Sequence, residues 1–126
     1  MIEILPAPAT EALAIAERHA CSGCRGETMI DFDFEYAYQP IVNVKTRTIY
    51  AHEALVRGPN GESAASVLAQ VNDSNRYRFD QACRVKAVAG ASRLGMQEYL
   101  SINFLPNAVY RPDICIRSTF QAAREY

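Results

Sequence analysis

Residues 34–57, FEYAYQPIVNVKTRTIYAHEALVR, carry the strongest secondary-structure signal in the chain. Phe34 to Val44 is rich in aromatic and β-branched residues, which predicts a strand. The polar residues 43–48 can turn the chain, so a second strand, Ile49 to Val56, is expected to return antiparallel to the first. Pro40 has no N–H for a ladder and favours an edge, a strand end or a bulge. The segment therefore predicts a β-hairpin.

Helical and strand patterns alternate after the hairpin. Ser63 is expected to cap a short helix, and a longer helix is expected from about Tyr77 to Leu94, ended by Gly95. The apolar run Tyr99–Leu105 predicts a buried strand of a parallel sheet, and residues 118–126 begin another helical pattern. This order predicts an α/β fold, in which ligands collect at the carboxyl ends of the strands.

Before the hairpin, residues 1–31 are expected to form a short helical N-terminal extension, which leaves residues 32–126 for the main domain. The extension contains a CxxC motif, Cys21 and Cys24, close to His19. Such a motif can bind zinc or act as a redox pair, although it lacks the second ligand pair of a usual structural zinc site. Unpaired surface thiols are the other interpretation, and the sequence leaves both open.

The composition is that of an ordinary soluble chain. Of its 126 residues, 49% are hydrophobic and 21% are charged, which favours one compact unit. A formal net charge of -1 and a pI near 6.1 argue against binding to duplex nucleic acid or to an anionic membrane. No apolar run approaches the roughly 20 residues of a membrane span, and no secretion signal is recognisable at the start. We therefore expect a cytoplasmic protein with reduced cysteines.

Polar residues on the predicted strands are the candidates for chemistry. Alternation places Glu53, Leu55 and Arg57 on one strand face, where the two charged groups form either a structural ion pair or part of a site. An unpaired amide at Asn103, inside a predicted buried strand, would cost about 1–3 kcal/mol, so it needs a hydrogen-bond partner or a metal. Carboxylate and amide oxygens suit Mg²⁺ or Mn²⁺, and a guanidinium suits phosphate. Spacing alone does not separate half of a metal-assisted phosphodiester site from a hydrogen-bonded core.

Other conspicuous side chains are interpreted as structural. Aromatic residues on strands and helix faces are expected to form core instead of a stacking platform for bases: Tyr36, Tyr38, Tyr50, Phe79 and Phe104. The basic residues of the long helix are expected to form a solvated face: Arg76, Arg78, Arg84 and Lys86. His52 lies on the strand face opposite Glu53 and is expected to pack or to lie at the surface, not to bind a ligand.

Three motifs of this chain resemble, in order and spacing, the opening motifs of EAL domains. They are YQPIV at residues 38–42, EALVR at residues 53–57 and LSINF at residues 100–104. The resemblance runs from about Phe34 to the end of the chain. It implies a modified TIM-like barrel whose first strand runs antiparallel to the others. It also implies an enzyme that hydrolyses cyclic di-GMP to linear pGpG with magnesium or manganese.

The resemblance also implies roles for individual residues. Glu53 and Asn103 match metal ligands of the family, while Gln39, Leu55 and Arg57 match residues that line the dinucleotide site. The family's later motifs are not found in this sequence: a further metal-binding glutamate, paired aspartates, a catalytic lysine and a late glutamate. The resemblance therefore supplies only part of an active site.

A TIM-like barrel typically needs about 250 residues, about twice the length of this chain. We therefore expect a partial barrel that is inactive alone, with its C-terminal half absent. An open sheet edge and an uncovered apolar face favour self-association or pairing with a missing C-terminal half. The alternative function is a non-catalytic module that binds cyclic di-GMP or docks to a protein partner.

Overall fold

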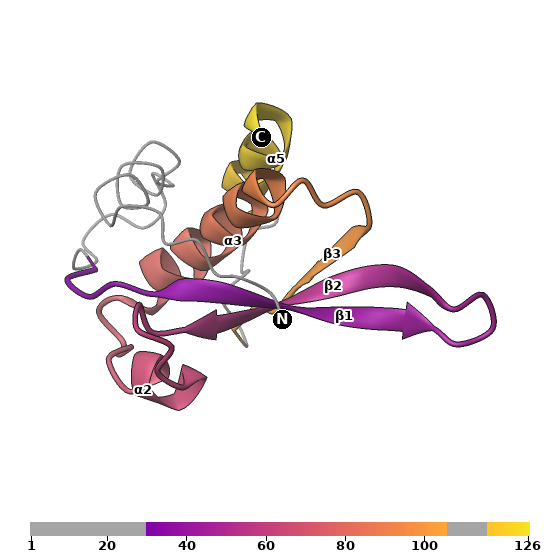
Figure 1. Cartoon of the computed structure of the whole chain (residues 1–126). Coiled ribbons are helices and arrows are strands. Elements are labelled where there is room, and N and C mark those ends of the chain that lie inside the picture. Colours follow the sequence, from indigo (N-terminus) through magenta and orange to yellow (C-terminus); the bar gives the residue numbers. More distant parts are fainter. Residues whose placement is uncertain (1–29, 106–115) are drawn as a thin grey trace.

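The computed structural model describes residues 30–105 and 116–126. The predicted N-terminal extension lies almost entirely outside these residues, and so do His19, Cys21 and Cys24 of the candidate zinc or redox site. Figure 1 shows helices and strands in alternation, as the sequence predicts. In order along the chain they are β1 (Glu35–Asn43), β2 (Thr48–Arg57), α2 (Ala64–Leu68), α3 (Arg76–Arg93), β3 (Tyr99–Ile102) and α5 (Arg117–Glu125).

The three strands form one sheet in the order β1-β2-β3. β1 pairs antiparallel with β2, which confirms the predicted hairpin, and β3 pairs parallel with β2. Pro40 lies in β1, an edge strand of this sheet, next to a register shift between Ile41 and Val42. This placement agrees with its lack of an N–H donor. The α/β class and the antiparallel first strand are confirmed, while the sheet of the described residues is open and not a closed barrel.

Helices α2 and α3 connect β2 to β3, and α3 covers one face of the sheet (Figure 1). The core lies between them, where Tyr36, Tyr38 and Ala54 of the strands pack against Phe79 and Cys83 of the helix. On its other side α3 contacts α5. A hydrophobic core on one face of a sheet thus fixes which strand residues point away from α3, towards the candidate site.

Capping residues define the ends of the helices. The hydroxyl of Ser63 accepts a hydrogen bond from the backbone N–H of Ser66 at 3.3 Å, which confirms it as the cap of α2. Gly95 follows α3 with a φ of +66°, a left-handed conformation that glycine adopts without a Cβ penalty. The N–H of Met96 bonds back to the carbonyl of Ala91 at 3.1 Å and closes the helix end.

β3 is shorter and more exposed than the sequence predicts. It has four residues, and its side chains alternate between half-buried and exposed, with Tyr99 70% exposed. The prediction of a buried strand was wrong, because in the described part of the chain α3 covers one face of this strand and nothing covers the other. The expectation that Tyr50 and Phe104 belong to the core was also wrong, because Tyr50 lies on β2 beyond the residues that pair with β3 and Phe104 follows the end of β3, whereas Tyr36, Tyr38 and Phe79 are buried as expected.

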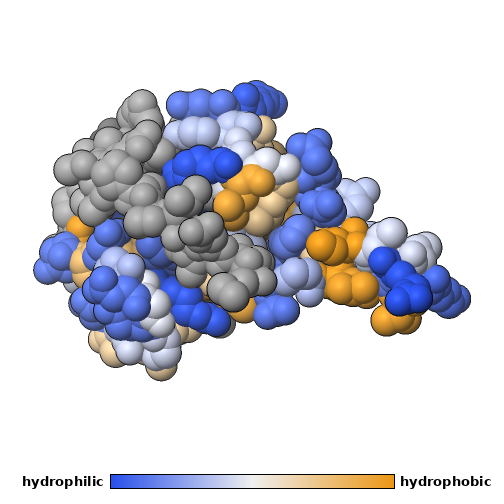
Figure 2. All heavy atoms as spheres, viewed as in Figure 1, coloured by the Kyte–Doolittle hydropathy of each residue, from blue (hydrophilic) through white to orange (hydrophobic). Residues whose placement is uncertain are grey.

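The hairpin extends past β3 as a two-stranded arm, residues 41–50 (Figure 1). β3 pairs only with residues 51–54 of β2, so no third strand supports the arm. Figure 2 shows apolar side chains gathered on it. The exposed apolar residues of the arm are Ile41, Val42, Val44, Ile49 and Tyr50. None of the helices in the described ranges has the length and hydropathy that crossing a membrane would require.

Candidate functional site

The predicted site residues of the hairpin share the sheet face that points away from α3. The register places Gln39 of β1 directly opposite Glu53 of β2. Since side chains alternate along a strand, Leu55 and Arg57 follow Glu53 on this same face. Glu53, Leu55 and Arg57 are half-buried, and Gln39 is exposed. The sheet thus presents a carboxylate, an amide and a guanidinium to one side.

Asn103 comes directly after β3 and meets Glu53. Its Nδ2 donates a hydrogen bond to Glu53 Oε1 at 3.0 Å, although the two residues are 50 positions apart in sequence. The parallel register of β2 and β3, in which Glu53 lies opposite Ser101, brings them together. The predicted convergence of an acid at 53 and an amide at 103 is therefore confirmed.

The surroundings of Asn103 differ from the prediction. Asn103 is exposed and follows the last residue of β3, so its amide is not inside a buried strand. The hydrogen bond of Asn103 to Glu53 is therefore not required to avoid the cost of a buried, unpaired amide. Within residues 30–105 and 116–126, the amide oxygen of Asn103 and the second carboxylate oxygen of Glu53 accept no side-chain hydrogen bond. A carboxylate oxygen of β2 and an amide oxygen just after β3 are thus available to a ligand.

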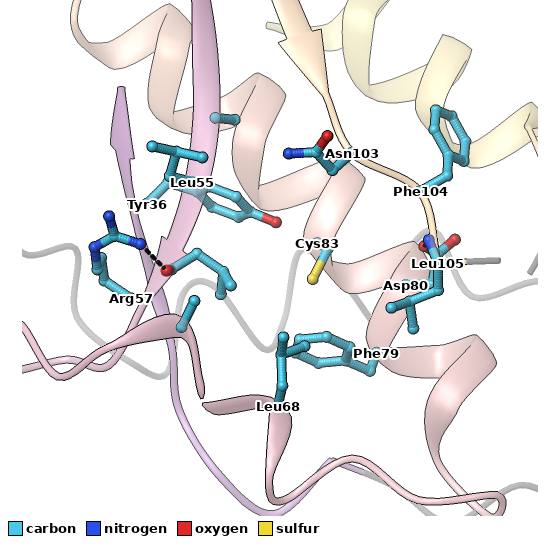
Figure 3. A pocket seen from close by; sticks show the side chains of 13 residues that line it. Tyr36, Leu55, Arg57, Leu68, Phe79, Asp80, Cys83, Asn103, Phe104 and Leu105 are labelled. Carbon is cyan, nitrogen blue, oxygen red and sulfur yellow. Dashed lines mark hydrogen bonds between the residues drawn. The ribbon is translucent and has the colours of Figure 1, made fainter. Parts of the chain in front are cut away.

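Arg57 does not pair with Glu53. Its Nη1 donates to the carbonyl of Val56 at 2.7 Å, the dashed contact in Figure 3. Among the described residues, no ion pair joins Arg57 to a carboxylate, so the structural ion pair that the sequence left open is not formed. One neighbouring carbonyl accepts from the guanidinium, and no carboxylate of the described residues neutralises it.

A hollow of about 220 Å³ opens beside these residues (Figure 3). It lies at the carboxyl end of β2, against α3: Phe79 and Cys83 line it from the helix, and Leu55, Arg57 and Asn103 line it from the ends of the strands. Typical small-molecule sites measure about 300–1,000 Å³, so this hollow suits part of a ligand and not a whole dinucleotide.

Two titratable groups of the hollow, the Cys83 thiol and the Tyr36 hydroxyl, do not suit acid–base or nucleophilic chemistry at neutral pH. Burial raises the pKa of the Cys83 thiol to about 12, so at neutral pH it is protonated and acts as an apolar wall. Burial also raises the pKa of Tyr36 well above its usual value. His52 is buried on the α3 side of the sheet, with Nδ1 3.7 Å from Glu98 Oε2, and does not face the site.

The donors of the site fit a hard divalent cation incompletely. One carboxylate and one amide oxygen are suitable ligands for Mg²⁺, Mn²⁺ or Ca²⁺, which take six or more oxygens. In the described part of the chain, no group of three or more histidine, cysteine, aspartate or glutamate side chains could hold a metal. Glu53 and Asn103 would therefore hold a cation together with water, with a ligand, or with residues beyond those described.

Sequence reasoning missed the burial of two charged residues on α3. Arg84 and Lys86 were expected on a solvated helix face, and both are buried. Lys86 Nζ lies 2.9 Å from Asp33 Oδ1 at the start of β1, while Arg84 Nη2 lies 3.0 Å from Asp80 Oδ2, next to the segment that carries Asn103. The four-residue spacing of Asp80 and Arg84 on one helix was the signal that could have identified this pair.

Solved structures with a similar fold include proteins of two bacteria. A standalone versatile EAL protein of Vibrio cholerae O395, solved in its c-di-GMP-bound form, superposes with a TM-score of 0.74 at 61% sequence identity, covering 77% of this chain and 41% of that one. BlrP1 of Klebsiella pneumoniae, solved with calcium and cyclic di-GMP, superposes with a TM-score of 0.66 at 29% identity, covering 73% and 24%. BlrP1 with manganese and cyclic di-GMP gives a TM-score of 0.61 at 30% identity, covering 76% and 26%.

No family model matches the chain, and no curated protein matches it either. The chain spans less than half the length of the solved proteins that it resembles. Over the shared region the agreement is in both fold and sequence, because 61% identity to the Vibrio protein accompanies a TM-score of 0.74. On this combined agreement, the chain belongs to the EAL-domain family.

Proposed function

We propose that this chain supplies part of the active site of a metal-dependent cyclic di-GMP phosphodiesterase, which hydrolyses cyclic di-GMP to linear pGpG. The observation that carries the proposal is the Glu53–Asn103 pair, a carboxylate and an amide joined by a hydrogen bond of 3.0 Å from Nδ2 to Oε1, on the sheet face that also carries Arg57, which no carboxylate of the described residues neutralises. The ligands of the solved relatives support it. The Vibrio EAL protein was solved with c-di-GMP, and BlrP1 with cyclic di-GMP and calcium or manganese.

Glu53 and Asn103 would hold the divalent cation, Mg²⁺ or Mn²⁺. When bound, the cation activates water and offsets charge on the attacking and leaving oxygens of an in-line displacement. Asn103 now directs its Nδ2 to Glu53. A half-turn of the amide exchanges nitrogen for oxygen and gives up one hydrogen bond, worth about 1 kcal/mol net, which is small beside the energy of metal ligation.

The remaining residues of the face would bind the dinucleotide. Arg57 would hold a phosphate through paired N–H donors, since it is not neutralised by a carboxylate of the described chain. Leu55 lines the hollow of about 220 Å³ and would give apolar contact to a base or ribose. Gln39, opposite Glu53, would add a directional hydrogen bond.

Binding and hydrolysis are tested separately. Manganese affinity is measured by calorimetry for this chain and for Glu53→Gln, with Glu98→Gln as the matched control, because Glu98 is also a partly exposed glutamate near β3 but contacts His52 on the other face. We expect Glu53→Gln to weaken binding at least 10-fold and Glu98→Gln to leave it unchanged. Equal affinities for all three proteins would contradict the metal role of Glu53.

Hydrolysis is measured as production of linear pGpG with magnesium, for this chain and for a version extended to full barrel length. We expect turnover from the extended version alone, because the described residues provide two oxygen ligands and no group of three acids, histidines or cysteines. Comparable turnover by the short chain would refute its inactivity.

Binding without hydrolysis by the extended version would favour the non-catalytic module. In that case Arg57→Ala should still weaken cyclic di-GMP binding by about 10-fold to 100-fold, the equivalent of about 1–3 kcal/mol for a lost charged contact.

A further inference from the structure

A buried ion pair on α3 faces the segment that carries Asn103. Asp80 and Arg84 lie one helical turn apart, with side chains 2% and 1% exposed and Nη2 3.0 Å from Oδ2. The Nη2–Oδ2 contact lacks the direction of a hydrogen bond. Buried pairs of this kind often add little stability, because desolvation of both charges offsets their attraction. The contacts that Asp80 and Arg84 make with other residues are therefore more informative than the stability of the pair.

Both side chains hold residues that directly follow Asn103. Asp80 Oδ1 accepts a hydrogen bond from the backbone N–H of Leu105 at 2.9 Å. The guanidinium of Arg84 lies over the ring of Phe104, 5.1 Å from its centroid. Figure 3 shows Leu105 beside Asp80, with Phe104 and Asn103 on the same segment. Two consecutive residues are thus fixed to α3 by one charged pair.

The hold on these residues matters because Asn103 lies outside the ladder. β3 ends at Ile102, so the sheet register stops one residue before the amide that meets Glu53. The direction of the Asn103 side chain then depends on where the chain goes next. That course is fixed by the contacts of Phe104 and Leu105 with α3.

We propose that Asp80 and Arg84 are positioning residues for the site. They fix Phe104 and Leu105, and through them they hold the Asn103 amide at hydrogen-bond distance from Glu53. The meaning of this arrangement for catalysis rests on the proposed function. The positioning itself is a property of the metal-free chain and is tested without metal or activity.

The test follows the side-chain amide of Asn103 by ¹H–¹⁵N NMR in the full chain, with its signals assigned from their loss in Asn103→Ala. The variant Asp80→Leu/Arg84→Met removes both charges together, so neither remains buried and unpaired. We expect the Asn103 amide shifts to move to those of an unconstrained asparagine. Asp80→Asn keeps an oxygen for the Leu105 N–H and should retain shifts closer to wild type.

Lys86→Met is the matched control. Lys86 is also a buried charge on α3, but it contacts Asp33 and the carbonyl of Phe34, just before β1, and not the residues that follow Asn103. It should leave the Asn103 signals in place. Phe104→Leu, at an exposed position, removes the ring beneath Arg84 and should move the signals even if the double variant does not fold. Unchanged Asn103 signals in the variants that fold, or an equal change in Lys86→Met, would overturn the proposal.

Titration with Mn²⁺ separates this inference from the proposed function. Paramagnetic broadening of the Asn103 signals in the wild type is expected from a cation bound beside it, with affinity lowered about 10-fold to 100-fold in the double variant, as for other residues that orient metal ligands. If the wild type shows no broadening, the metal role fails. The positioning role still stands or falls on the metal-free shifts.

Discussion

Helix α3 approaches β1 so closely at Gly90 that a methyl group there would overlap the hydroxyl of Tyr38. A Cβ built on Gly90 would lie far inside contact distance of Tyr38 Oη and 3.2 Å from the ring carbon Cζ. The same hydroxyl donates to the carbonyl of Ala87 at 2.7 Å, so it is not free to turn away. Tyr38 is itself buried, and its ring has no exit to solvent. We therefore expect Gly90→Ala to be destabilising for a steric reason.

The expected magnitudes follow from these contacts. Alanine in a helix interior gains about 1 kcal/mol over glycine, while overpacking of a core costs about 1–3 kcal/mol, so Gly90→Ala should lose up to about 2 kcal/mol. Tyr38→Phe alone loses one hydrogen bond, about 1 kcal/mol. Without the hydroxyl most of the overlap disappears. Gly90→Ala should then stabilise the Tyr38→Phe protein by up to about 1 kcal/mol, which reverses the sign of its effect.

Urea unfolding of the wild type, both single variants and the double variant, followed by circular dichroism, measures this cycle. Gly95→Ala is the control. Gly95 has a positive φ and no neighbour within 4 Å of an added Cβ, so its cost should be the same with and without Tyr38→Phe. If Gly90→Ala shifts the free energy of unfolding by one amount in both backgrounds, the steric reasoning is refuted.

Three further predictions concern charge, reactivity and association. Burial, partly offset by Lys86, raises the pKa of Glu35 above 4.5. The protonated carboxyl therefore contributes its full share to folding stability below pH 4.5, and this contribution is lost as the pH rises through the raised pKa. Glu35→Gln should gain stability relative to wild type between about pH 4 and pH 7 in urea unfolding, and the opposite trend would contradict the burial argument. Cys83, with its pKa raised to about 12, should resist iodoacetamide in the folded chain and react in urea, as peptide mass spectrometry would reveal; labelling of the folded chain would show that the thiol is accessible. The exposed apolar arm should favour self-association, which a strictly monomeric species in light scattering would exclude.

The hairpin and the caps were predictable because their signals are local. A turn of polar residues between two β-branched runs, Ser63 before a helix and Gly95 after one each act within a few positions of the chain. The meeting of Glu53 with Asn103 was predictable for another reason. A helix between two strands makes them parallel, and parallel neighbours bring their carboxyl ends to one edge.

Burial was the property that the sequence did not determine. The run Tyr99–Leu105 is apolar enough for a strand covered on both faces, but coverage depends on which elements lie on each side. Arg84 and Lys86 posed the opposite problem. α3 packs against the sheet on one side and α5 on the other, so it has almost no solvated face, and its charges are buried against specific partners. Charge patterns alone do not reveal such partners.

Helix α3 connects the two halves of the candidate site physically as well as in sequence. Glu53 lies on the strand that precedes the helix, and Asn103 follows the strand that comes after it. The close approach at Gly90 sets the position of α3 against β1, and Asp80 with Arg84 sets the position of the Asn103 segment against α3. The distance between the two oxygen ligands is therefore defined by packing on the face opposite the site. A substitution that shifts α3 should alter metal binding even though it touches no ligand, because the sheet that carries Glu53 and the loop that carries Asn103 are both built on this helix.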